Sequence, residues 1–144
     1  MDIQKTYRNE DIKKLLNQRD PILMVDAFEE VSENVGSGEK FIDSENFFCV
    51  DGRFTEPGLI EHIAQSASAF VSYRAISYQG QKEAPVGYIG EVKKFVLSGA
   101  LPQVGKTVKT EITIQSEVMN ITSFSAKSCV DGEVIATCQM KLSV

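Results

Sequence analysis

The sequence predicts an α+β fold in which one long helix packs against a mostly antiparallel sheet. Residues 57–80 have a helical pattern, whereas alternating and β-branched residues after Gly80 are typical of strands. Asp131-Gly132, between two such strands, is a strong signal for a tight hairpin turn. Antiparallel hairpins provide no parallel crossovers, so a doubly wound nucleotide-binding fold is disfavoured.

The N-terminal third is expected to form a short helix and two strands. Asn9 is the expected N-cap of a helix over about residues 10–17, and Pro21 ends any helix before it. The run from Ile22 to Val31 is apolar in its first half, which predicts a strand buried at one end. A turn at Ser37-Gly38 should precede a second strand that begins within residues 40–43.

The central helix is expected to begin near Pro57, with Thr55 or Glu56 as its cap. Much of the helix surface carries small side chains, so other elements can approach it closely from several sides. A sheet could therefore wrap around the helix, or the helix could lie flat on one sheet. Its apolar face comprises Leu59, Ile60, Ile63, Ala67, Phe70, Val71 and Ala75.

Four strands are predicted after the helix, over residues 86–97, 107–119, 121–130 and 134–144. The alternation from Lys106 to Ile114 directs three side chains toward the core. These are Val108, Ile112 and Ile114.

Composition limits the classes of protein to consider. The 144 residues fit a single domain, 1–144, and 42% apolar with 24% charged residues is ordinary for a globular chain. A net charge of −5 without a basic cluster argues against nucleic acid as a partner. The sequence shows no signal peptide and no apolar run long enough to span a bilayer, so a cytoplasmic protein without membrane contact is expected.

The cysteine and histidine counts support neither a disulfide framework nor a zinc site. Three cysteines at irregular spacing accompany a single histidine. Cys129 and Cys138 are expected to be buried strand residues. No metal and no cofactor is expected.

Several short motifs occur in the order and spacing of a known family. They are residues 18–26 (QRDPILMVD), 46–48 (NFF), 52–54 (GRF), Pro57-Gly58, Glu61 with Ala64-Gln65, 88–90 (YIG), 93–95 (KKF) and 130–133 (VDGE). Through them the chain resembles the hotdog-fold 3-hydroxyacyl-[acyl-carrier-protein] dehydratases over nearly its whole length. The resemblance implies a hotdog fold, a long central helix wrapped by an antiparallel β-sheet. It also implies a dimer joined at its sheet edges and a tunnel for an acyl chain on a phosphopantetheine arm.

The resemblance also assigns roles to residues. In the family, a His in a Gly-His-Phe-Pro loop removes the α-proton, a helix Glu handles the departing hydroxyl, and a helix N-terminal N–H polarises the thioester carbonyl. Glu61 matches the Glu and Gly58 the glycine beside that N–H, whereas Arg53 stands where the family has its His. The segment 53–57 is also several residues shorter. The resemblance therefore implies Glu61 and Arg53 as the catalytic positions. The implied substrate-binding positions are Phe54, Gly58, Leu59, Gln65 and Tyr88.

Arg53 cannot act as a general base because arginine keeps its proton. His62 is one alternative base, but adjacent helix residues point about 100° apart, so it should face away from Glu61. Asp51 is another. Arg53 could instead pair with Glu61 across an interface, or bind the thioester carbonyl or the carrier's phosphate.

Three functions fit these residues. The first is a dehydratase of fatty acid or related lipid and polyene biosynthesis, acting on acyl-carrier-protein or CoA thioesters. The second is a non-catalytic subunit that pairs with an active paralogue. The third is an acyl thioesterase in which the helix carboxylate activates water. The expected assembly is a homodimer, a higher even oligomer, or a hetero-oligomer.

Overall fold

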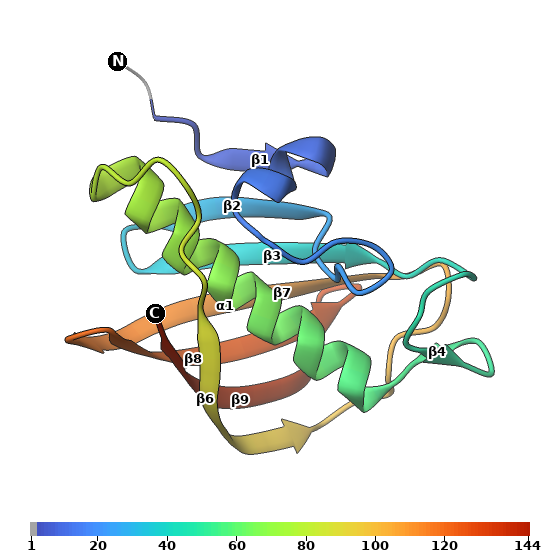
Figure 1. The fold of residues 1–144 in the computed structure, drawn as a ribbon. Coiled ribbons are helices and arrows are strands. Elements are labelled where there is room, and N and C mark those ends of the chain that lie inside the picture. The colour runs from blue at the N-terminus through green and yellow to red at the C-terminus, as the bar shows by residue number, and fades with distance from the viewer. Residues whose placement is uncertain (1–2) are drawn as a thin grey trace.

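A computed structural model describes residues 3–144, in which a curved sheet encloses one side of a single long α-helix (Figure 1). Seven strands form the sheet in the order β1-β2-β3-β7-β8-β9-β6, and all neighbours are antiparallel. The helix α1, Glu56–Tyr78, contacts β2, β3, β7, β8 and β9. The strands of the sheet are β1 (Thr6–Arg8), β2 (Ala27–Ser32), β3 (Val35–Phe41), β6 (Tyr88–Leu97), β7 (Thr107–Val118), β8 (Ile121–Val130) and β9 (Glu133–Ser143).

The predicted α+β class and the wrapped helix are confirmed. The four strands after the helix lie within two residues of their predicted ends. Asp131 and Gly132 form the turn between β8 and β9 with φ of 52° and 80°, the positive values that this hairpin requires. Within residues 3–144, no helix is long and apolar enough to cross a membrane.

The N-terminal predictions are only partly right. The short helix is a 3₁₀ helix, η1 (Asn9–Lys14). The predicted strand from Ile22 is wrong in its first half, because residues 22–25 pair with no strand and β2 begins at Ala27. The turn at Ser37-Gly38 is also wrong, since both residues lie inside β3. Two elements were not predicted: β1, and a small hairpin of β4 (Cys49–Val50) and β5 (Arg53–Phe54).

The glycines of β3 serve helix packing rather than a turn. A Cβ built on Gly38 would lie 2.1 Å from Ser66 Oγ, and one on Gly36 would lie 2.7 Å from the Phe28 ring. Phe28 in turn packs against Phe70 of α1, with ring centroids 5.6 Å apart. The missing side chains therefore allow the sheet to approach the helix closely.

The last strand of the sheet, β6, forms an open edge. It pairs with β9 on one side only, and its register shifts between Ile89 and Glu91 and again between Lys93 and Val96. Lys94, within the second bulge, has a φ of +53°. Nine of its ten residues are exposed, including the large apolar side chains Tyr88, Ile89, Val92, Val96 and Leu97.

We expect Gly38→Ala to destabilise the protein by about 1–3 kcal/mol, because the added methyl forces Ser66 or the strand to move. Urea unfolding measures this loss. Gly90→Ala is the matched control, since only Lys141 O lies within 4 Å of its built Cβ, and its effect should stay below about 0.5 kcal/mol. Equal stability of the two variants would contradict the close approach of β3 to α1.

Candidate functional site

The N-terminal end of α1 is built around Gly58. The Thr55 hydroxyl donates to Phe48 O (2.7 Å) instead of capping the helix. The N–H of Leu59 donates to Thr55 O (2.9 Å), so the N–H of Gly58, one residue earlier, has no carbonyl one turn behind it. A Cβ on Gly58 would lie 2.5 Å from Phe48 Cβ and 2.7 Å from the Phe54 ring. Only glycine fits, and the positive end of the helix dipole favours negative charge here.

Gln65 fixes the carboxylate of Glu61, one turn earlier on the same face of α1. Its Nε2 donates to Glu61 Oε1 (2.8 Å) and to Ile22 O (2.9 Å), and its Oε1 accepts the N–H of Met24 (2.6 Å). Gln65 is buried, whereas Glu61 is half-buried. Within residues 3–144, Glu61 Oε2 has no hydrogen-bond or ion-pair partner. The carboxylate is therefore held by one oxygen and offers the other.

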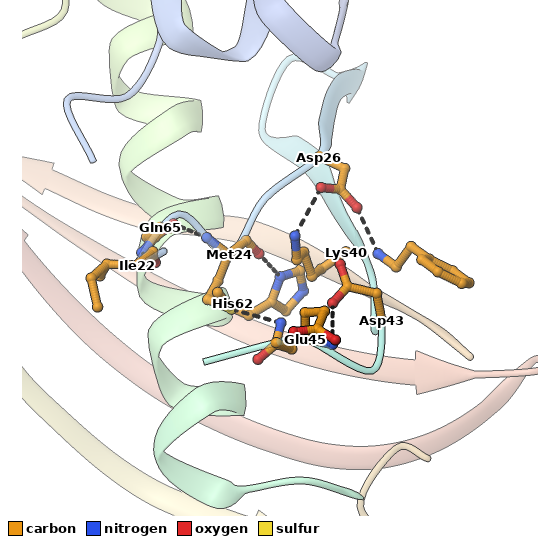
Figure 2. A network of polar contacts seen from close by, with 10 residues as sticks. Ile22, Met24, Asp26, Lys40, Asp43, Glu45, His62 and Gln65 are labelled. Atoms are coloured by element: carbon orange, nitrogen blue, oxygen red, sulfur yellow. Dashed lines mark hydrogen bonds and ion pairs between the residues drawn. The ribbon is translucent and has the colours of Figure 1, made fainter. Parts of the chain in front are cut away.

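His62 holds the other backbone group of Met24 (Figure 2). Its Nδ1 lies 2.8 Å from Met24 O, and its Nε2 lies 2.9 Å from Thr110 Oγ1, which is 2.6 Å from Ser128 Oγ. Because a carbonyl only accepts, Nδ1 carries the proton; Thr110 then donates to Nε2, and Ser128 donates to Thr110. All three side chains are fully buried. His62 thus reaches Thr110 of the sheet, whereas the carboxylate of Glu61 is bonded to Gln65.

Figure 2 also shows a more open group of polar residues beside Met24. Lys40 Nζ lies 3.1 Å from Asp26 Oδ1, and the N–H of Phe41 donates to Asp26 Oδ2 (2.7 Å). Asn46 Nδ2 approaches Met24 Sδ at 3.5 Å. Within residues 3–144, no group of three or more His, Cys, Asp or Glu side chains is placed to hold a metal ion.

Arg53 lies on β5, in the hairpin that projects beyond the N-terminal end of α1 (Figure 1). Its side chain is exposed, and Nη1 donates to Leu101 O (3.0 Å). It forms no ion pair with Glu61 inside the described chain, where Glu61 is bonded to Gln65, and its backbone bridges Gln103. Any pairing of Arg53 with Glu61 would have to occur between chains.

The remaining expected substrate-binding positions are dispersed. Phe54 and Leu59 are fully buried in the core beneath the start of α1. Tyr88 begins the edge strand β6, is 67% exposed and pairs with Ser143. The structure therefore groups Gly58, Glu61 and Gln65 on the first turns of α1 and places Tyr88 on another element. The segment Ile22–Met24 was not anticipated as part of the site, because its contacts join residues about 40 positions apart and leave no local sequence signal.

A family model described as "ApeP-like: ApeP dehydratase" matches residues 10–144. The chain belongs to the ApeP-like dehydratase family. The ApeP-like chain is also 28% identical over 142 residues to a 3-hydroxyacyl-[acyl-carrier-protein] dehydratase FabZ of Lactococcus lactis subsp. lactis (strain IL1403), covering 93% of this chain and 88% of that protein. The resemblance drawn from its motifs is confirmed.

Solved structures confirm the hotdog fold of the ApeP-like chain. The dehydratase heterocomplex ApeI:P from Xenorhabdus doucetiae aligns with a TM-score of 0.81 at 15% identity, over 92% of this chain and 89% of that one. A hypothetical thioesterase with coenzyme A from Streptococcus pneumoniae TIGR4 aligns with a TM-score of 0.61 at 8% identity, over 81% and 83% of the two chains.

His62, one alternative base of the ApeP-like chain, is poorly suited to proton abstraction. Burial lowers the pKa of His62 from 6.5 to about 4, and both of its ring nitrogens are occupied. Asp51 occupies the exposed turn between β4 and β5 with a φ of 52°. Burial, then the charge of Asp43, raises the pKa of Cys49, so this thiol stays protonated. The described chain thus presents a carboxylate without a matching histidine.

The low pKa of His62 makes stability pH-dependent. The unfolded state takes up a proton near pH 6.5 and the folded state only near pH 4, so folding loses stability as pH falls through this window. The loss approaches about 3 kcal/mol by pH 4. Urea unfolding of the wild type and His62→Gln at pH 7.5, 6, 5 and 4 tests this, because carboxylates contribute equally to both proteins. Parallel pH profiles would contradict the buried, neutral histidine.

Proposed function

We propose that this ApeP-like chain binds an acyl thioester at the N-terminal end of α1 and forms the half of a dehydratase that lacks its own general base. The observation that carries the proposal is the position of the single histidine: His62 is fully buried and bonded through both ring nitrogens. Arg53, which replaces the loop histidine of the resembling enzymes, keeps its proton. A 3-hydroxyacyl substrate must then lose its α-proton to a group from another chain.

Two groups of this chain would act on the substrate. The N–H of Gly58 would donate to the thioester carbonyl, where negative charge develops as the α-proton leaves. Glu61 would bind the 3-hydroxyl through Oε2 while Gln65 holds Oε1. Both groups lie on one rigid helix, which fixes their relative positions without a mobile loop.

The proposed substrates are thioesters of an acyl-carrier protein or of CoA, in fatty acid or related lipid and polyene biosynthesis. The L. lactis relative is named for acyl-carrier-protein substrates, and the S. pneumoniae structure contains coenzyme A. These relatives support a thioester carrier of this kind. They do not distinguish acyl-carrier protein from CoA, so the binding assays use thioesters of both.

The proposed partner is a second hotdog chain added at the open edge of β6. The exposed apolar side chains of β6 and its unpaired backbone groups are what strand addition requires. The matching ApeI:P structure is described as a heterocomplex. This supports a hetero-oligomer with an active paralogue as a second assembly, in addition to the homodimer.

The function is tested with the purified chain and 3-hydroxyacyl and saturated acyl thioesters on carrier protein and CoA. We expect binding without water loss or thiol release, and about tenfold weaker binding of the 3-hydroxyacyl thioester to Glu61→Gln because a charge-assisted hydrogen bond is lost. Glu56→Gln is the matched control, an exposed carboxylate in the first turn of the same helix. Dehydration by the chain alone would show an autonomous enzyme, thiol release would show a thioesterase, and no binding would refute the site.

The partner surface is tested by light scattering on a sizing column. We expect the wild type to form a dimer and Val92→Asp on β6 to be monomeric, since each added carboxylate would be buried near its symmetry mate. Val31→Asp on β2, at a residue that is also exposed, should remain dimeric. Dissociation of Val31→Asp, with Val92→Asp intact, would place the interface elsewhere.

A further inference from the structure

The face of the sheet that points away from α1 carries a buried hydroxyl without a hydrogen-bond partner. Side chains alternate along a strand, and Gly36 and Gly38 of β3 face α1, since Cβ atoms built on them would meet Phe70 and Ser66. Ser37, between the two glycines, therefore points to the opposite face. It is only 4% exposed, and its Oγ makes no hydrogen bond within residues 3–144. Such a group lowers stability unless something binds it.

Two carboxylates flank this hydroxyl. In the register of the sheet, Glu29 of β2 and Glu111 of β7 are the direct partners of Ser37 on its two sides. Directly opposed residues share a face, so all three side chains point away from α1. Two strand spacings place the Cβ atoms of the glutamates about 10 Å apart, with Ser37 midway between them. Both glutamates are exposed, so both carboxylates can turn toward the hydroxyl.

Glu29 and Glu111 have no ion-pair partner in the part of the chain that the structure describes. The other glutamates on β2, β3 and β7 each lie within 4.0 Å of a Lys or Arg nitrogen; they are Glu30, Glu39 and Glu117. Lys127 of β8 is the partner of Glu111 on the side away from Ser37, and no ion pair joins the two in the described residues. The two carboxylates beside the buried hydroxyl are thus the ones on these strands whose charge is not compensated.

We infer that Glu29, Ser37 and Glu111 form a weak site for a hydrated divalent cation that prefers oxygen ligands, Mg²⁺ or Ca²⁺. Mg²⁺ is commonly bound through one or two carboxylates and keeps several of its waters, which suits a site with only two acidic residues. The Ser37 oxygen would bind the cation through a lone pair and so gain the partner that it lacks. No local sequence pattern indicates this site, because its residues lie on three strands. The site is independent of the proposed thioester site.

A cation at this site would join three strands at the row that supports α1. Gly38, next to Ser37, lies against Ser66, and Thr110, next to Glu111, lies 2.9 Å from His62. The ligands come from β2, β3 and β7, which are brought together only when the sheet forms. Binding should therefore stabilise the folded state, so unfolding reports occupancy.

Calorimetric titration of the full chain with MgCl₂ and, separately, with CaCl₂ at constant ionic strength tests the inference. We expect one saturable site with a Kd of about 0.1–1 mM for at least one of the two cations. Glu29→Gln and Glu111→Gln should each weaken binding by about tenfold, because one of two charged ligands is lost. Glu133→Gln is the matched control, an exposed carboxylate at the start of β9, and should bind as the wild type does.

Lys127→Gln tests the electrostatics of the site in the opposite direction. It removes a positive charge opposite Glu111 and should tighten cation binding by about twofold or more. A variant that only damaged the sheet would weaken binding instead.

Ser37→Ala separates cation binding from a structural role of the hydroxyl. In EDTA the variant should resist urea at least as well as the wild type, because it loses a buried hydroxyl that has no partner. With 10 mM cation, the folding equilibrium constant of the wild type should rise about tenfold for a Kd of about 1 mM, and that of the variant should rise less. The absence of a saturable site, equal binding by Glu111→Gln and Glu133→Gln, or destabilisation by Ser37→Ala in EDTA would overturn the inference.

Discussion

Two side chains of α1 hold the backbone of Met24, and the candidate site depends on this attachment. Residues 22–25 have no neighbouring strand, yet buried backbone groups need hydrogen-bond partners. Gln65 accepts the N–H of Met24, and His62 donates to its carbonyl. The same Gln65 amide also binds Glu61. The side chain that holds residues 22–24 therefore also sets the orientation of the Glu61 carboxylate.

The sheet contributes to this attachment through its glycines. Gly38 pairs with Thr110, and Thr110 pairs with Ser128, so one row of the sheet runs beneath the helix. The missing side chain of Gly38 brings this row close to Ser66 and allows the Thr110 hydroxyl to reach His62. The sole histidine of the chain is therefore used to join helix, sheet and N-terminal segment. Because both of its ring nitrogens are bonded within the fold, His62 has a structural role.

The sequence predicted the elements whose signals are local. The pattern of α1, the four later strands and the Asp131-Gly132 turn each reside in a short stretch, and each is present. The apolar run from Ile22 looked like a strand because burial, not pairing, sets its composition. Ser37-Gly38 looked like a turn because glycine serves both turns and close packing. The positions of Gly58, Glu61 and Arg53 could be taken from motifs, but the role of Gln65 as an anchor for residues 22–24 depends on contacts that no local pattern records.

The two register shifts in β6 affect how readily the unpaired edge of the sheet can accept another strand. A flat, regular edge strand invites indiscriminate strand addition and aggregation. In β6 the ladder is interrupted twice, Lys94 adopts a left-handed conformation at the second interruption, and Lys93 beside it pairs with Glu91. A neighbouring strand can dock fully only if its own shape matches these kinks. The two shifts therefore interrupt the row of unpaired backbone groups on which open-ended strand addition depends.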